Sequence, residues 1–227
     1  MRAIFKKELK SYFLSPIGYT VIGIFLLCFS VFFYQDIFSS GSVDLGYLYF
    51  AVAMNGLIII APILTMRMFA EEKKTGTDQL ILTSPVGVFK IVLGKLLAAL
   101  FVIIVTLILS LIYWGIISFF GKINIMSSLI AVLGFILISM AILAFGMFAS
   151  SITENQIIAA IITIVFLVIS ILVGNINIIF SGFNLINFYL PFAKGIISLE
   201  SGILLILFTI LFITLTIIVL KRRKLVR

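Results

Sequence analysis

The chain has 227 residues, of which 63% are hydrophobic and 11% are charged, and its mean hydropathy is +1.38. Soluble domains are typically about 45–50% apolar and about 25% charged. This composition excludes a soluble domain and predicts an all-α membrane protein with one transmembrane domain over residues 1–227. The net charge of +8 does not indicate nucleic acid as a partner, because the basic residues lie at the ends of apolar stretches, where they set membrane topology.

The first segment, residues 2–15, is predicted to be an amphipathic helix on the membrane surface. Its apolar residues recur at helical spacing and form one stripe: Phe5, Leu9, Tyr12 and Phe13. Its lysines lie off that stripe: Lys6, Lys7 and Lys10. A basic helix with an aromatic side is typical of a membrane interface. The alternative is an ordinary basic flank of the first transmembrane span.

Six apolar stretches are predicted to cross the membrane, a task that takes about 20 residues per helix. In chain order these are residues 17–33, 48–66, 91–119, 127–149, 156–173 and 201–220. The polar residues 34–47 are expected to form a loop. Residues 174–200 are almost uncharged but are interrupted by Gly, Asn and Pro, which favours a segment that enters the bilayer part-way. The alternative is an additional full span.

The charge distribution predicts that both termini are cytoplasmic. With six spans, every Lys and Arg except Lys122 and Lys194 lies on the cytoplasmic side, so fourteen of the sixteen basic residues are inside. This follows the positive-inside rule. A seventh span would carry the basic C-terminus across the membrane, which argues against that alternative.

Few polar residues lie within the spans. Asn55 and Thr65 are weak candidates for lining a transport pathway, although hydrogen bonding between helices is the commoner role. Gly146 and Ser150, four residues apart, allow close helix packing. The acidic residues lie mainly in loops and termini, whereas ion-coupled transporters place ionisable groups within the membrane. This argues against a stand-alone ion-coupled carrier or channel, which is the alternative function.

The sequence offers no catalytic set or cofactor site. It contains no His and a single cysteine, Cys28, so we expect no metal site, no intramolecular disulfide and no enzymatic activity. The nearest fragment of a phosphate-binding loop is Gly94-Lys95, but Leu96 follows it and the earlier glycine is missing.

The longest charged interruption, residues 66–90, is predicted to be a cytoplasmic loop. Residues 67–74 are expected to extend the second helix, with Glu71 and Lys74 three apart on one face. Gly76 can end that helix in a left-handed conformation, and Thr77 can cap a short helix over residues 78–83. Three aliphatic residues of that helix would be exposed: Leu80, Ile81 and Leu82. They either pack against the protein's own helices or dock into a partner.

Four groups of residues, in order along the chain, resemble type-2 ABC transporter permeases. They are Lys6-Lys7-Glu8-Leu9-Lys10 with Ser15-Pro16-Ile17-Gly18-Tyr19, the loop residues 71–86, Ser150-Ser151-Ile152-Thr153-Glu154-Asn155-Gln156, and Ala193-Lys194-Gly195-Ile196-Ile197. The chain is most similar to the small six-span permeases assigned to gliding motility and nitrous-oxide-reductase maturation. It has Gln79 where the family usually has a glutamate.

The resemblance implies a permease subunit in a bacterial plasma membrane, part of an exporter with a second permease, identical or homologous. ATP and magnesium would bind to a separate ATPase subunit. Residues 2–15 would be the interfacial elbow, and residues 174–200 the re-entrant element. The contact with the ATPase would lie in the loop: Glu71, Glu72, Lys74, Gly76, Thr77, Asp78, Gln79, Leu80, Ile81, Leu82, Thr83, Ser84 and Pro85.

Overall fold

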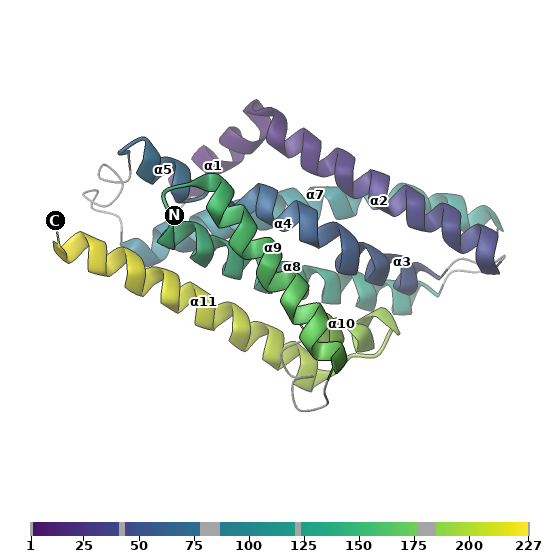
Figure 1. Cartoon of the computed structure of the whole chain (residues 1–227). Coiled ribbons are helices and arrows are strands. Elements are labelled where there is room, and N and C mark those ends of the chain that lie inside the picture. The colour runs from purple at the N-terminus through teal and green to yellow at the C-terminus, as the bar shows by residue number, and fades with distance from the viewer. Residues whose placement is uncertain (1, 41–43, 78–86, 121–123, 177–184, 227) are drawn as a thin grey trace.

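A computed structural model describes residues 2–40, 44–77, 87–120, 124–176 and 185–226 of the chain. Within these ranges every regular element is a helix, which confirms the all-α prediction, and most of the long helices run side by side along one elongated bundle (Figure 1). Five helical stretches are long and apolar enough to cross a membrane: α2, α3–α4, α7, α8 and α11. A sixth apolar stretch, Gln156–Leu172 in α9, is shorter. The sixth span therefore stays a prediction.

The first two helices confirm the break at Ser15 but correct the loop that follows the first span. The N-terminal helix α1 spans Arg2–Leu14 and α2 spans Pro16–Ser40, so the expected loop over residues 34–47 is wrong for residues 34–40, while residues 41–43 lie outside the described residues. Polar side chains can continue a helix beyond the apolar layer. Asp44 then caps α3, because its carboxylate accepts a hydrogen bond from the Gly46 N–H at 2.9 Å.

The predicted second span is not one regular helix. It consists of α3 (Leu45–Ala51), a π-helical turn (Val52–Gly56) and α4 (Leu57–Thr65), in which Pro62 lies one turn before the end. The expected helical extension over residues 67–74 is also wrong. The chain leaves the helix after Thr65 and forms a new short helix, α5 (Ala70–Lys74). Groups from other helices satisfy the backbone at this break, as described below.

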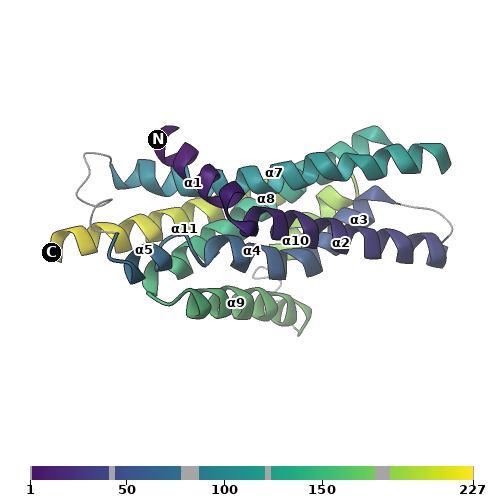
Figure 2. The same ribbon diagram turned by 90° about the horizontal axis from the view of Figure 1, so that it is seen from above.

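Helix α8 (Ile125–Ile152) lies at the centre of the bundle, beside α4, α7 (Val88–Phe120), α9 (Gln156–Ile176) and α11 (Leu199–Val226), as the view in Figure 2 shows. Its contact with α4 depends on Gly146, because a methyl group there would lie 2.3 Å from Thr65 Oγ1. This confirms the small-residue packing expected at this position.

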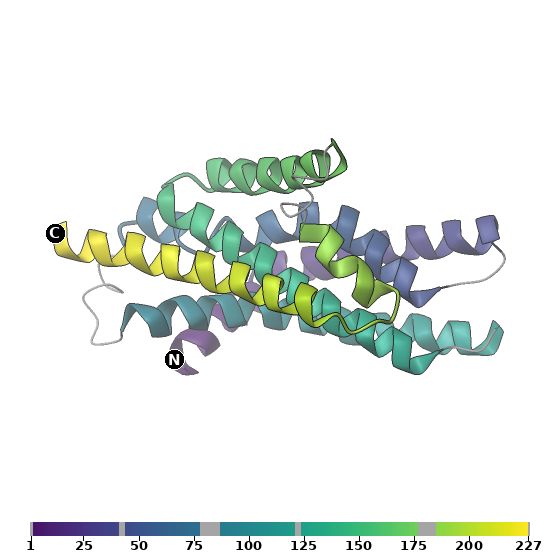
Figure 3. The same cartoon turned by 90° about the horizontal axis from the view of Figure 1, so that it is seen from below.

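Residues 174–200 contain the end of α9, the short helix α10 (Leu185–Ala193) and the start of α11. Nine helical residues extend only about 14 Å, which is less than half of the ~30 Å apolar layer. Helix α10 therefore cannot be an additional span. It packs against α8, where the Tyr189 hydroxyl donates to the Ala131 carbonyl at 3.1 Å, and it lies far from the C-terminus (Figure 3).

Replacing Gly146 with leucine is expected to destabilise the contact between α4 and α8. Overpacking of this kind typically costs about 1–3 kcal/mol, so the variant should melt at a lower temperature in detergent. Gly23→Leu on α2 is the control, because a Cβ atom added there has no heavy atom within 4 Å apart from its own stretch of helix. Equal melting temperatures for the two variants would contradict the packing described here.

Candidate functional site

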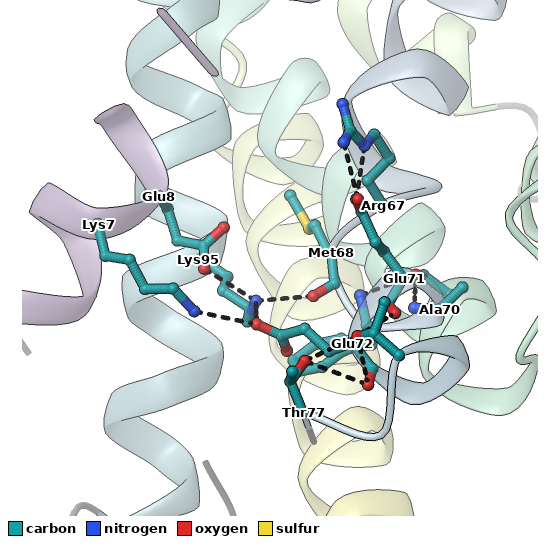
Figure 4. A network of polar contacts seen from close by, with 12 residues as sticks. Lys7, Glu8, Arg67, Met68, Ala70, Glu71, Glu72, Thr77 and Lys95 are labelled. Carbon is teal, nitrogen blue, oxygen red and sulfur yellow. Dashed lines mark hydrogen bonds and ion pairs between the residues drawn. The ribbon is translucent and has the colours of Figure 1, made fainter. Parts of the chain in front are cut away.

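The break between α4 and α5, residues 66–69, is the most heavily bonded polar site in the described part of the chain, and we refer to it as the junction. A helix that ends leaves carbonyl groups without partners, and a helix that begins leaves N–H groups without partners. Both kinds of group occur within these four residues. Side chains from α7 and α8 satisfy them, a side chain from α1 bonds to the neighbouring Leu64 carbonyl, and Figure 4 shows part of this network.

Lys95 of α7 joins three helices at the junction. Its ammonium donates hydrogen bonds to Glu8 Oε1 of α1 at 3.0 Å, to the Met68 carbonyl at 2.7 Å and to Glu72 Oε1 of α5 at 2.8 Å (Figure 4). It also lies 5.1 Å from the centre of the Phe69 ring. The Lys95 side chain is only 2% exposed. A buried ammonium is stable only when all its donors are paired, and here they are.

Ser150 near the end of α8 bonds to both sides of the junction. Its hydroxyl oxygen accepts from the N–H groups of Phe69 at 3.1 Å and Ala70 at 3.0 Å, and the hydroxyl donates to the Met66 carbonyl at 3.2 Å. It therefore acts as an N-cap for α5 that is supplied by another helix. In return, the Lys73 ammonium of α5 donates to the carbonyls of Ser151 and, at 2.9 Å, Thr153. These two carbonyls lie at the C-terminal end of α8, where a cation is favoured.

Two further contacts complete the site. The Tyr12 hydroxyl of α1 donates to the Leu64 carbonyl at 2.9 Å, which the helix break has left without its usual N–H partner. Arg67 forms a double hydrogen bond with Glu71, at 2.6 and 2.8 Å. This guanidinium contact holds the pKa of the Glu71 carboxyl below its usual value. Because both side chains are partly exposed, the pair contributes little to stability.

A partly open cavity of about 220 Å³ lies between α1 and α5, beside the start of the loop. Acidic and basic side chains both face it, so its charge is close to balanced. Its lining residues are Lys7, Glu8, Ser11, Tyr12, Ser15, Ile17, Arg67, Met68, Glu71, Glu72, Thr75, Thr77 and Lys95. It is therefore a recess with charged side chains at the base of the loop.

The structure describes only the first part of the predicted partner contact. Asp78, Gln79, Leu80, Ile81, Leu82, Thr83, Ser84 and Pro85 lie outside the described residues. Gly76 has a φ of +71°, which confirms the left-handed conformation. Glu71 bonds to Arg67, not to Lys74 as its spacing suggested, and Glu72 points to Lys95 (Figure 4). Lys74 and Thr77 are exposed, and Thr77 bonds back to Thr75 at 2.9 Å.

The stripe on α1 faces the protein. Phe5 packs edge-on against Phe101 of α7 at 6.1 Å, and Tyr12 is buried at the junction. The other members of the stripe, Leu9 and Phe13, are partly buried against the core. The lysines of α1, Lys6, Lys7 and Lys10, are all exposed, and Lys7 also lies 3.5 Å from Glu72.

The two pathway candidates have different environments. Thr65 is fully buried against Gly146, and its hydroxyl donates to the Ala61 carbonyl at 2.8 Å, so it makes a packing contact. Asn55 is exposed on the π-helical turn, and its amide donates to the Ala51 carbonyl at 3.0 Å. Only Asn55 is therefore placed where it could meet a solute.

The sequence analysis missed the roles of Lys95, Glu8, Ser150, Lys73 and Arg67. One signal was present: Lys95 lies one turn inside an apolar span, where an ionisable residue requires a partner. The identity of that partner depends on how α1 and α5 fold back onto α7, which no local pattern contains.

Comparison with known protein families gives one result. Residues 35–220 match the family described as ABC-2 family transporter protein, so the match covers most of the chain. No curated protein sequence matches closely enough to count as a relative. The family agrees with the permease resemblance of the sequence motifs, without assigning a subgroup.

Lys95→Met should destabilise the protein strongly, because it leaves two carboxylates and a carbonyl without their common donor. Removing one partner from a buried ion pair costs about 3–5 kcal/mol, so we expect a melting temperature lower by roughly 10 °C. Lys90→Met is the matched control, since Lys90 is exposed on the same helix. Adding Glu8→Gln and Glu72→Gln should recover part of the loss. A Lys95→Met protein as stable as the control would refute this role.

Proposed function

The chain belongs to the ABC-2 transporter family, and we propose that it is the six-span permease subunit of an ATP-driven exporter in a bacterial plasma membrane. Members of this family are membrane components of ABC transporters, which associate with an ATPase subunit. ATP and magnesium would bind to that subunit, not to this chain. A second permease, identical or homologous, would complete the membrane part. Both termini would be cytoplasmic, with the loop after α5 on the same side.

The observation that carries this proposal is the bonding of the junction. Helix α5 has only five residues and would not be stable by itself. It is fixed to α7 through Lys95, to α8 through Ser150 and Lys73, and to α1 through the ion pair between Lys7 and Glu72. A partner that displaced the loop would therefore move α5 and the ends of three longer helices together. Contiguous networks of this kind carry conformational coupling between distant sites.

Helix α8 is the helix to which such a movement would be passed. One end of it holds the junction through Ser150, and the other part packs against α10 and α11. Because protein interiors are closely packed, a shift of α8 must be accommodated by its neighbours along its whole length. We propose that ATP-driven closure of the ATPase subunits pushes the loop and that α8 carries the movement across the membrane.

The same proposal assigns positions to the remaining elements. Helix α9 would be the sixth span, and α10 would be the re-entrant element on the side opposite the loop. Helix α1 would lie at the cytoplasmic interface. Asn55 would face the transport pathway, because a polar side chain exposed on a spanning helix is costly in contact with lipid.

Gentle purification of the tagged chain from its native membrane, followed by mass spectrometry, tests the association. We expect a soluble ATPase to co-purify in near one-to-one ratio with the permease. Its reproducible absence from a folded, dimeric chain would instead favour the stand-alone carrier. Transport by proteoliposomes that contain only this chain would then be the deciding observation.

Replacing Leu80, Ile81 and Leu82 with glutamate should remove the ATPase from the purified complex, because charged side chains cannot enter an apolar groove. The control replaces Lys221 and Arg222 with glutamate, which alters charge at the C-terminal end of α11 instead. Both proteins should remain monodisperse. An ATPase that still co-purifies in full amount with the triple variant would show that these residues are not the docking element.

A further inference from the structure

The outer face of α1 carries a row of cations that the junction does not use. Arg2, Lys6 and Lys10 follow one another at intervals of four residues, so they form a single ridge on the helix. We refer to these three residues as the basic stripe. All three are exposed, and none forms an ion pair with a residue in the described part of the chain.

The acidic residue of α1 does not neutralise this stripe. Glu8 points away from it, into the protein, where it bonds to Lys95 (Figure 4). The apolar side of α1 is likewise turned inward, against α7 and the junction. The outward face is therefore positive along most of the helix, and neighbouring side chains leave it accessible.

The position of α1 indicates what this face meets. Helix α1 crosses the end of α7 at an angle, and its N-terminus projects beyond the bundle (Figure 2). At its other end, where the chain turns into α2, Leu14 is 85% exposed and Tyr19 is 63% exposed. Exposed aliphatic and tyrosine side chains at the start of a spanning helix are typical of the boundary between headgroups and acyl chains. A membrane boundary at these residues would place the basic stripe on its water side, at headgroup level.

We propose that the basic stripe of α1 is a binding surface for anionic phospholipid headgroups of the cytoplasmic leaflet. Phosphate oxygens are matched partners for guanidinium and ammonium groups. Basic segments next to a membrane gain affinity from each cation near an anionic surface. Because Glu8 and Tyr12 join the same helix to the junction, a bound lipid would hold α1 in the position that supports α5. The surface rests on the membrane location of the chain and on the proposed cytoplasmic side of its N-terminus, not on the export activity.

Native mass spectrometry of the detergent-purified chain, titrated with phosphatidylglycerol or phosphatidylcholine, tests this surface. Wild-type protein should bind phosphatidylglycerol more tightly, and added salt should weaken that preference. The variant Arg2→Gln, Lys6→Gln, Lys10→Gln should lose about fivefold in affinity for each cation removed, or about 100-fold in all. Its affinity for phosphatidylcholine should stay the same.

Two control variants separate a local site from general charge. Lys221→Gln, Arg222→Gln, Arg223→Gln removes three cations from the C-terminal end of α11 and should retain most of the binding. Arg2→Lys, Lys6→Arg, Lys10→Arg keeps the charge and should bind like wild type, which excludes misfolding as the cause. Equal losses of phosphatidylglycerol affinity in the glutamine variants of α1 and α11 would overturn the proposal. So would an unchanged lipid affinity of the α1 variant that coincides with loss of the co-purifying ATPase, since the stripe would then bind the protein partner.

Discussion

The structure depends on one buried cation. The Lys95 ammonium is enclosed at the point where α1, α5 and α7 meet, and each of its three hydrogen bonds goes to a different segment of the chain. Burying a charge is costly unless every donor is satisfied. The positions of Glu8, Met68 and Glu72 are therefore determined together, and with them the direction in which the chain enters the loop.

The other bonds at the junction have the same effect, mostly through uncharged groups. Breaking a helix at residues 66–69 frees backbone carbonyls and N–H groups that would be expensive to bury unpaired. Tyr12 and Ser150 satisfy them from α1 and α8, and Lys73 returns a bond to the end of α8. The break is thus stable because other helices complete it. The result is a short helix that is held at both ends by other helices.

Composition and periodicity predicted the helices, the membrane class and the break at Ser15, because apolar length and proline act locally. They failed at residues 34–40, where polar side chains merely mark the end of the apolar layer and α2 continues to Ser40. They also failed at the junction, since the cap for α5 comes from Ser150, eighty residues later in the sequence. Gly76 was predicted correctly because a left-handed residue is a local requirement. The partners of Glu71 and Glu72 depend on the tertiary fold. Spacing alone suggested Lys74 as the partner of Glu71, whereas the structure has Arg67.

The bonds at the junction should make the loop base and the end of α8 move together. Spin labels at Thr75 and Glu154, in a protein whose single cysteine Cys28 is replaced by serine, would report the distance between them by pulsed electron resonance. Joint movement predicts the same distance in the complex with and without an ATP analogue, while a pair from Thr75 to Lys194 changes. A distance from Thr75 to Glu154 that shifts on adding the analogue would contradict it, because α5 would then move independently of α8.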